Sequence, residues 1–211
     1  MANKILILGQ SGTGKSTSIR NLDNQETYII QLVKKELPFR AWKKKYNADL
    51  KNIAVLKDSV SIQGYLKSIS DNAPHIKTVV IDDLQYLMSV EFIERVFESG
   101  WDKFNEIASN MFNLLMFPDD LREDLTVVFL SHIDTTEQQE KMKTIGKMLD
   151  EKITPEGLFS IVLKTITVNG EYFFETQNNG SNTIKSPMEM LLQKEPNDLK
   201  IILEKIEEYN N

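Results

Sequence analysis

Several residue types and patterns are missing from this sequence, and each absence excludes a class of protein. The 211 residues include no cysteine, which excludes a disulfide framework and a thiolate metal site. His75 and His132 are the only histidines, so a metal centre built from several histidines is not expected. No apolar run approaches the roughly 18 residues of a membrane-spanning helix, and the apolar pattern that starts at Lys4 leaves no room for a signal peptide. We therefore expect a cytoplasmic protein with no membrane contact.

The charge balance limits the class of partner. The net charge is -6, which argues against a protein that coats nucleic acid through bulk charge, although a local basic surface remains open. Hydrophobic residues make up 41% of the chain, enough for a substantial core, and the length suggests one domain. We expect residues 1–211 to form that domain, with 186–211 as a C-terminal helical extension.

Hydrophobic patterning predicts strands that alternate with helices over about the first 130 residues. Strands are expected at 4–8, 27–33, 53–56, 78–81 and 126–130. Helices are expected at 15–22, 60–70, 84–98 and 101–117, and 38–46 is either a loop or a short helix. This alternation predicts an α/β fold with a mainly parallel central sheet.

The last third of the chain breaks the alternation. Residues 134–152 are polar and have no clear period apart from a short helix. Two strands at 158–168 and 171–176 flank Asn169-Gly170, which is a strong hairpin turn pattern. Asn197-Asp198 is expected to cap a final helix that runs to Glu208. The sheet should therefore end in a C-terminal antiparallel hairpin.

The stretch ILILGQSGTGKST places a glycine-rich turn between a strand and a helix. The spacing from Gly9 to Ser16 is G-x-x-x-x-G-K-S, in which backbone N–H groups cradle a β-phosphate. Lys15 is expected to reach the β- and γ-phosphate oxygens and the Ser16 hydroxyl to ligate magnesium. The residues expected to hold the nucleotide are Gly9, Gln10, Ser11, Gly12, Thr13, Gly14, Lys15, Ser16 and Thr17.

Acidic residues follow two of the expected strands. Asp82 and Asp83 come directly after TVVI, and the carboxyl ends of parallel strands share one edge with the phosphate loop. Asp82 is therefore expected to meet magnesium, directly or through water. Asp83 is a candidate to orient or deprotonate the attacking water, and Glu36, after the second strand, is a rival base. The alternative is that Asp82 and Asp83 only cap the helix that starts at Leu84.

The strand TVVFL ends in Ser131 and His132. A polar residue at the tip of this strand can touch a γ-phosphate or its attacking water, and His132 is the stronger candidate for that sensor role. The alternative is that His132 only has its hydrogen bonds satisfied at the end of the strand and has no sensor role.

Two basic stretches stand out against the acidic total. Residues 34–51 hold seven lysines and arginines against two acidic residues, with Phe39, Trp42 and Tyr46 among them. Such a mixture can stack bases and hold the backbone of a single nucleic-acid strand; a solvated face whose aromatics enter the core is the alternative. Residues 138–157 form the second stretch, in a region beside the nucleotide site where loops commonly carry function. The candidates for contacts with DNA or a neighbouring subunit are Arg40, Lys43, Lys44, Lys143, Lys147 and Lys152.

The segments GQSGTGKS, TVVIDD, TVVFLSH and GKMLDEKITPEG, in this order, resemble phage-encoded P-loop ATP-binding proteins with a RecA-like core. PFRAWKKKYN, DDLQYLM, KMKTIGKMLDEKITPEG and TQNNGSNTIKSP look like that phage group in particular. The resemblance covers most of the chain. It implies a three-layer P-loop NTPase fold and ATP as the nucleotide. Some relatives are single-strand-annealing recombinases that oligomerise on single-stranded DNA.

These observations predict a magnesium-dependent ATPase that acts on single-stranded DNA in phage recombination, annealing or replication, in the host cytoplasm. We expect ATP or ADP as ligand and a homo-oligomer. The alternative is a nucleotide-dependent switch or assembly factor that binds a protein, which the acidic charge favours. A small-molecule kinase is disfavoured, because its lid usually holds clustered arginines, whereas the four arginines here are scattered: Arg20, Arg40, Arg95 and Arg122.

Overall fold

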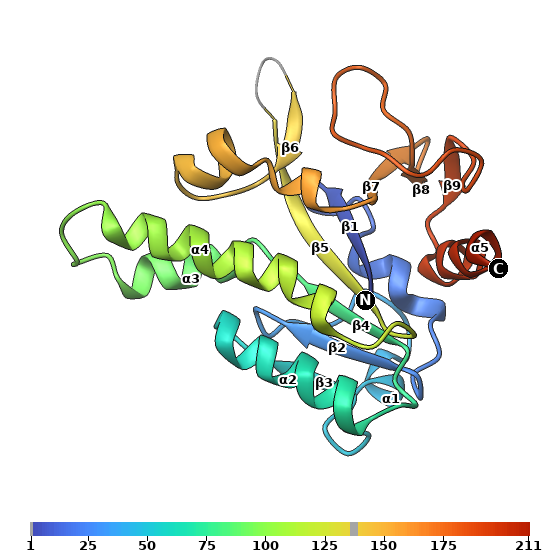
Figure 1. Cartoon of the computed structure of the whole chain (residues 1–211). Helices are drawn as coiled ribbons and strands as arrows, with labels where there is room; N and C mark the ends of the chain where they lie inside the picture. The colour runs from blue at the N-terminus through green and yellow to red at the C-terminus, as the bar shows by residue number, and fades with distance from the viewer. Residues whose placement is uncertain (1, 136–138) are drawn as a thin grey trace.

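The computed structural model describes residues 2–135 and 139–211 and has three layers, with a central sheet between two layers of helices (Figure 1). Its strands are mostly parallel, and an antiparallel hairpin follows near the C-terminus. The expected α/β fold with a mainly parallel sheet and a C-terminal hairpin is confirmed. Within the described residues, no helix is both long and apolar enough to cross a membrane.

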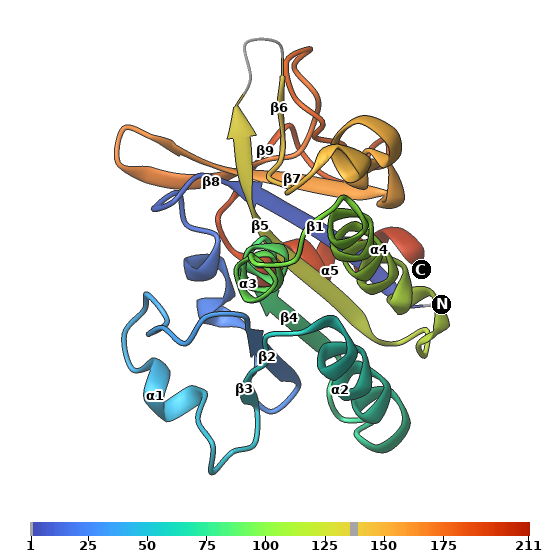
Figure 2. The same cartoon turned by 90° about the vertical axis from the view of Figure 1, so that its left-hand side faces the viewer.

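The strand order sets the positions of the expected motifs. The sheet runs β3-β2-β4-β5-β1-β7-β8-β9, as Figure 2 shows, and β6 pairs with β5. One strand, β5, separates the phosphate-loop strand β1 from β4, which ends at Asp82. This insertion is the strand order of a RecA-like core, so that fold class is confirmed. The parallel strands are β1 (Asn3–Gly9), β2 (Thr27–Gln31), β3 (Ile53–Val55), β4 (Thr78–Asp82), β5 (Thr126–Thr135) and β7 (Ile161–Val168).

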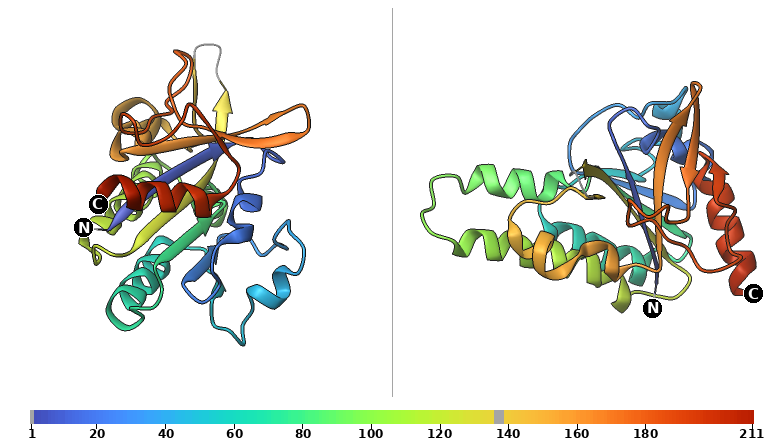
Figure 3. Two further views of the ribbon diagram at one scale, coloured as in Figure 1. Left: turned by 90° about the vertical axis from the view of Figure 1, so that its right-hand side faces the viewer. Right: turned by 90° about the horizontal axis from the view of Figure 1, so that it is seen from above.

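Apolar side chains on alternate residues of each strand build two cores, one on each face of the sheet. In β1, Leu6 and Leu8 join one core, whereas Ile5 and Ile7 join the other. The first core is covered by helices on the face that carries α4, as Figure 3 shows, and α5 lies on the opposite face. The helices are α1 (Trp42–Lys45), α2 (Ser59–Asn72), α3 (Tyr86–Glu94), α4 (Asp102–Met116) and α5 (Leu199–Asn210).

The C-terminal hairpin forms where the Asn-Gly pattern predicts it. β7 and β8 (Glu171–Glu175) pair antiparallel, and Asn169 and Gly170 have φ values of 54° and 82°, as a tight hairpin turn requires. Asp198 caps α5 as expected, because its side chain accepts a hydrogen bond from the Lys200 N–H at 3.1 Å. The segment 186–211 is not purely helical, since β9 (Lys194–Pro196) extends the sheet beyond β8.

Other elements differ from the prediction in length. The helix expected at 15–22 is a short 3-10 helix, Ser16–Asn21, and the helix expected at 84–98 is α3, which ends at Glu94. β5 runs on to Thr135 because it pairs with β6 (Glu140–Met142), a strand that the polar sequence does not reveal. A helical turn, Met148–Ile153, follows. Residues 136–138 of this polar segment lie outside the described residues.

Replacing a buried leucine in the centre of the sheet tests this packing. Leu130 in β5 is fully buried, so Leu130→Ala should lower the free energy of unfolding by about 2–5 kcal/mol, since it leaves a cavity. Leu192, which is 68% exposed, is the matched control. Leu192→Ala should change the free energy of unfolding by less than about 0.5 kcal/mol. Urea unfolding measures both; equal losses would contradict the assigned core.

Candidate nucleotide site

The ends of four parallel strands bring the expected site residues to one edge of the sheet. The pairing register sets Gly9 beside His132 and Gln31 beside Asp82. The phosphate loop leaves β1 at this edge. The prediction that these motifs share one edge is met because every connection between them is a crossover that returns the chain in the same direction.

The phosphate loop has the backbone that its glycines allow. Gly12 and Gly14 have φ values of 79° and 99°, which residues with a Cβ rarely adopt. At Gly9 a Cβ would lie 2.0 Å from the Thr165 hydroxyl, so the loop also needs glycine for close approach to β7. Thr13 bonds the Thr165 hydroxyl at 2.6 Å and donates to the Gln10 carbonyl at 2.8 Å. The loop is therefore tied to the sheet.

Lys15 lies inside this loop. Its ammonium donates to the carbonyls of Gly9 at 2.7 Å and Gln10 at 2.8 Å, and the residue is only 5% exposed. Burial lowers the pKa of Lys15 to about 8, although the carboxylates of Asp83 and Asp82 partly oppose that shift. A phosphate at the loop would supply the anion that this buried cation lacks.

Ser16 and Asp82 form the pair expected for a divalent cation. The Ser16 hydroxyl donates to Oδ1 of Asp82 at 2.8 Å, while Oδ2 of Asp82 is buried without a hydrogen-bond partner. Burial raises the pKa of Asp82, and the nearby ammonium of Lys35 opposes this. Two hard oxygen ligands, one of them a carboxylate with an oxygen that accepts no hydrogen bond, fit Mg²⁺, which keeps several waters and binds substrate phosphates. Within residues 2–135 and 139–211, no three acidic or histidine side chains gather into a closed metal cage.

Lys35 is a site residue that the sequence did not reveal. Its ammonium lies 3.4 Å from Oδ2 of Asp82 and forms an ion pair with Asp83. Burial alone would lower the pKa of Lys35, but the two carboxylates outweigh burial and raise it. The sequence signal that could have identified Lys35 is its position shortly after β2, because β2 pairs with β4, the strand that ends at Asp82. Lys35 therefore supplies a positive charge to both carboxylates.

Asp83 and His132 meet in front of the same strands. Asp83 has a φ of 64°, a costly conformation for a residue with a side chain, of the kind found at functional sites. His132 Nε2 lies 3.6 Å from Oδ1 of Asp83, and burial, with Lys15 as the next cause, lowers the pKa of His132. Ser131, the weaker sensor candidate, is fully buried and its hydroxyl has no hydrogen-bond partner.

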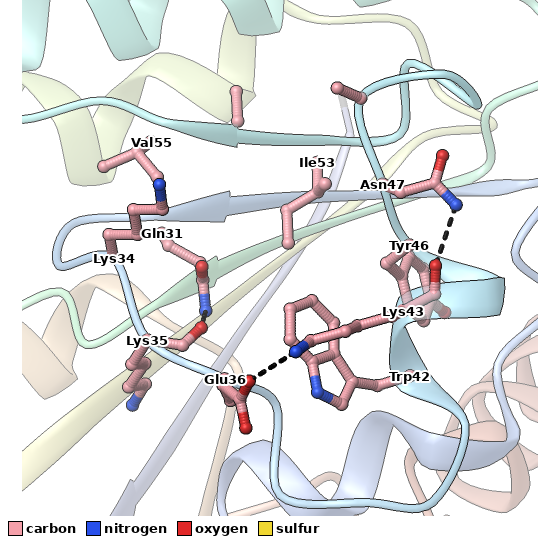
Figure 4. Close-up of a pocket in the computed structure, with 12 residues that line it drawn as sticks. Gln31, Lys34, Lys35, Glu36, Trp42, Lys43, Tyr46, Asn47, Ile53 and Val55 are labelled. Carbon is pink, nitrogen blue, oxygen red and sulfur yellow. Dashed lines mark hydrogen bonds and ion pairs between the residues drawn. The ribbon is translucent and has the colours of Figure 1, made fainter.

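Glu36 does not join this cluster. Its side chain is 73% exposed and pairs with Lys43 at 2.6 Å. Figure 4 shows Glu36 directed toward Lys43, whereas the neighbouring Lys35 points away from Trp42. Asp83, and not Glu36, therefore lies with Lys35 and His132 beside Asp82.

The basic candidates lie in two separate places. Arg40, Lys43 and Lys44 are exposed on and before α1, where Tyr46 is fully buried and Phe39 and Trp42 pack partly against the core. Of these three aromatic residues, Tyr46 therefore enters the core completely, as the alternative interpretation of residues 34–51 expected. Lys143 is near enough to His132 to lower its pKa, whereas Lys147 is 88% exposed and lies 3.8 Å from Glu151. Lys152 is exposed.

Two further residues line the phosphate loop from the C-terminal side and were not expected from sequence. A Cβ at Gly14 would lie 3.1 Å from both the carboxamide of Asn197 and the ring of Tyr172. The carboxamide of Asn197 is buried and has no hydrogen-bond partner. Both residues come from β8 and the end of β9, so the hairpin region closes one side of the site.

Comparisons with known proteins add little beyond the fold. No protein-family model matches the chain, and no curated protein matches its sequence. Among solved structures, it is similar to a KaiC-like protein from the hyperthermophilic archaeon Pyrococcus horikoshii OT3, with a TM-score of 0.47 and 16% identity over 82% of this chain and 76% of that chain. At this level the similarity supports no statement about activity, and the assignment of the fold rests on the strand order.

Removing the Lys35 ammonium tests its relation to the two carboxylates. Lys35→Met should lower the free energy of unfolding by about 1–2 kcal/mol, less than for a fully buried pair because Lys35 is 35% exposed on its side chain. Mg²⁺ without nucleotide should then raise the melting temperature of the variant more than that of the unaltered protein, since the carboxylates are left without their cation.

Lys34→Met, at the exposed neighbouring position, is the control and should respond to Mg²⁺ as the unaltered protein does. Thermal unfolding over a Mg²⁺ series measures all three proteins. If Mg²⁺ raises the melting temperature of all three proteins equally, Lys35 does not balance the charge of Asp82 and Asp83.

Proposed function

We propose that this chain is a magnesium-dependent ATPase of phage type that acts on single-stranded DNA in recombination, annealing or replication. The observation that carries the nucleotide part is the Ser16–Asp82 hydrogen bond at 2.8 Å beside the buried Lys15 ammonium. A loop of backbone N–H groups, a lysine and a serine–carboxylate pair is the set of groups that binds a nucleotide phosphate with Mg²⁺.

Each group has a defined task in this proposal. Ser16 and Asp82 would hold Mg²⁺, which would supply positive charge against the phosphates. Lys15 leaves the carbonyls of Gly9 and Gln10 and donates to phosphate oxygens instead. The helix dipole contributes little here, because the helix after the loop has only six residues. Backbone N–H groups and Lys15 therefore carry most of the phosphate binding.

Asp83 is the proposed residue that orients or deprotonates the attacking water. It is a carboxylate beside Asp82, held by Lys35 and faced by His132. Burial keeps His132 neutral near pH 7, so one ring nitrogen remains an acceptor and the other a donor. His132 can then contact a γ-phosphate or the water, which is the sensor role proposed for it.

ATP is proposed as the nucleotide because of the resemblance to phage ATP-binding proteins. The guanine-type pattern N-K-x-D is absent from the sequence. ADP is the expected product.

Single-stranded DNA is proposed as the partner because of the exposed basic side chains. Arg40 and Lys44 lie on one side of the site, and Lys143, Lys147 and Lys152 follow β5 on the other. Lysine and arginine on exposed loops bind the phosphate backbone in a salt-dependent manner. The net charge of -6 requires that any such binding be local.

A nucleotide-dependent switch that binds a protein is the second candidate. The turn between α3 and α4 exposes Ile93, Phe97 and Trp101, with exposed fractions of 64%, 99% and 81%. Exposed apolar side chains that cluster in this way mark protein-binding surfaces. A pull-down that recovers a protein from host lysate only with ATP, with no effect of DNA on turnover, would favour this candidate.

Removing the phosphate-loop ammonium tests the nucleotide site. Lys15→Ala should reduce ATP turnover at least about 100-fold, because the preorganised cation that meets the phosphates is lost. Its circular dichroism and urea midpoint should stay close to those of the unaltered protein. Lys67→Ala, on exposed α2, is the control that should retain turnover. Undiminished hydrolysis by Lys15→Ala would refute the site.

Adding nucleic acid tests the partner. Saturating single-stranded DNA should increase ATP turnover, and the DNA affinity should fall as salt rises, because bound counterions are released. Arg40→Ala with Lys44→Ala should weaken DNA binding without changing turnover in its absence. If DNA neither binds at low salt nor alters turnover, the DNA part of the proposal fails while the nucleotide site stands.

A further inference from the structure

The turn between α3 and α4, here called the α3–α4 tip (residues 93–101), is held rigidly. The buried Lys103 ammonium donates to the carbonyls of Arg95, Val96 and Glu98 at 3.2, 3.4 and 2.7 Å. The Arg95 guanidinium binds carboxylates on both helices, among them Glu91 at 3.1 Å and Glu106 at 2.7 Å. These bonds fix the backbone at the C-terminal end of α3, so the tip has one defined shape.

This rigid tip displays apolar side chains to solvent. Phe97 is 99% exposed and Trp101 is 81% exposed, with Ile93 and Val96 beside them. Figure 1 shows α3 and α4 projecting side by side beyond the sheet, with this turn at their far end. Ordering a turn in order to expose two aromatic rings is unfavourable for an isolated chain, so the tip has the character of an anchor for a partner.

The tip is also acidic. Residues 91–106 contain five acidic side chains and two basic ones. Both basic side chains, Arg95 and Lys103, already bind groups within the tip. Glu94 and Asp102 are exposed and add negative charge around the aromatic rings. The partner of this tip should therefore offer an apolar hollow with a basic rim.

The same chain carries such a hollow at the edge of its sheet. A pocket of about 750 Å³ lies against the edge strand β3, here called the β3-edge pocket, with Trp42, Tyr46, Ile53 and Val55 in its walls. Figure 4 shows Ile53 directed toward Trp42, with Val55 beside Lys34 at the other end of the pocket. Ligand pockets of about 300–1,000 Å³ enclose several rings, so two aromatic side chains fit.

The rim of the β3-edge pocket is basic. Lys34 and Lys43 line it and are exposed, and Arg40 and Lys44 lie nearby in the sequence. Glu36 also lines the pocket and pairs with Lys43 at 2.6 Å, so Lys34 contributes the positive charge that is not paired with Glu36. Residues 34–51 carry seven basic side chains against two acidic ones. The pocket thus has the apolar walls and the positive charge that the α3–α4 tip requires.

We propose that the α3–α4 tip of one copy inserts into the β3-edge pocket of a second copy of this chain. The two surfaces lie on different parts of the molecule, so the contact is heterologous and each added copy leaves one tip and one pocket free. Contacts of this type build rings where the rotation closes and filaments where it does not. The contact goes beyond the proposed nucleotide site and does not depend on it, but it uses the same basic rim as the proposed DNA contact of Arg40 and Lys44.

Two variants, each altered only at exposed positions, test the tip and the pocket separately. The tip variant combines Phe97→Asp and Trp101→Asp; position 101 is the N-cap of α4, where aspartate is favourable. The pocket variant combines Lys34→Glu and Lys43→Glu, which reverses the charge of the rim. Val60→Asp is the control, because Val60 is 76% exposed in the first turn of α2 and belongs neither to the tip nor to the pocket lining.

Sedimentation velocity over a concentration series at low salt measures the assembly, with one protein carrying a fluorescent label in mixtures. The unaltered protein and Val60→Asp should associate, and each double variant should sediment as a single chain. An equimolar mixture of the two double variants should form a species of two chains and nothing larger. Only one intact tip can then meet one intact pocket.

Several results would overturn the proposal. The unaltered protein could sediment as a single chain throughout, or the tip variant could associate as strongly as the unaltered protein. A mixture that stays monomeric would exclude the head-to-tail contact, and a pocket variant that still forms dimers would indicate a tip-to-tip contact instead. If the pocket variant still assembles but no longer binds single-stranded DNA, the β3-edge pocket belongs to nucleic acid instead of a second copy.

Discussion

The buried carboxylate of Asp82 is the constraint on which the rest of the site depends. A fully buried aspartate at the end of a central strand needs positive charge or hydrogen bonds, because its charge is costly away from water. Ser16 supplies one hydrogen bond from the phosphate loop and Lys35 supplies the charge from the loop after β2. Three segments far apart in sequence are therefore drawn to one strand end, and a Mg²⁺–nucleotide complex would meet all three.

The loop after β2 connects this site to the surface of the molecule. Lys35 faces Asp82 and Asp83, whereas the next residue, Glu36, faces Lys43 at the rim of the β3-edge pocket. Gln31, at the end of β2, donates to the Lys35 carbonyl at 3.1 Å and steadies the turn between them. A ligand that displaces the Lys35 ammonium thus acts on the same short segment that shapes the pocket. The proposed nucleotide site and the proposed subunit contact therefore share this loop.

The sequence predicted those features that local patterns determine. The glycines and Lys15 identify the phosphate loop, the apolar run before Asp82 places that residue at a strand end, and Asn169-Gly170 marks the hairpin. Lys35, Asn197 and Tyr172 were missed because their roles come from tertiary contacts that no local spacing encodes. The strand β6 was missed because it is only three residues long and two of them, Glu140 and Lys141, are polar, so no alternation is visible in the sequence. The directions of the Asp83 and Glu36 side chains likewise could not be predicted from the sequence.

Ser16 and Asp82 are proposed to hold Mg²⁺ beside the phosphates of a bound nucleotide. Calorimetric titration of ADP with and without Mg²⁺ examines this on the unaltered protein and on Asp82→Asn, because asparagine keeps the shape of the side chain and removes its charge. We expect Mg²⁺ to tighten ADP binding to the unaltered protein, and Asp82→Asn to lose most of this effect while remaining folded. If Asp82→Asn shows the same Mg²⁺ dependence as the unaltered protein, Asp82 does not hold the cation.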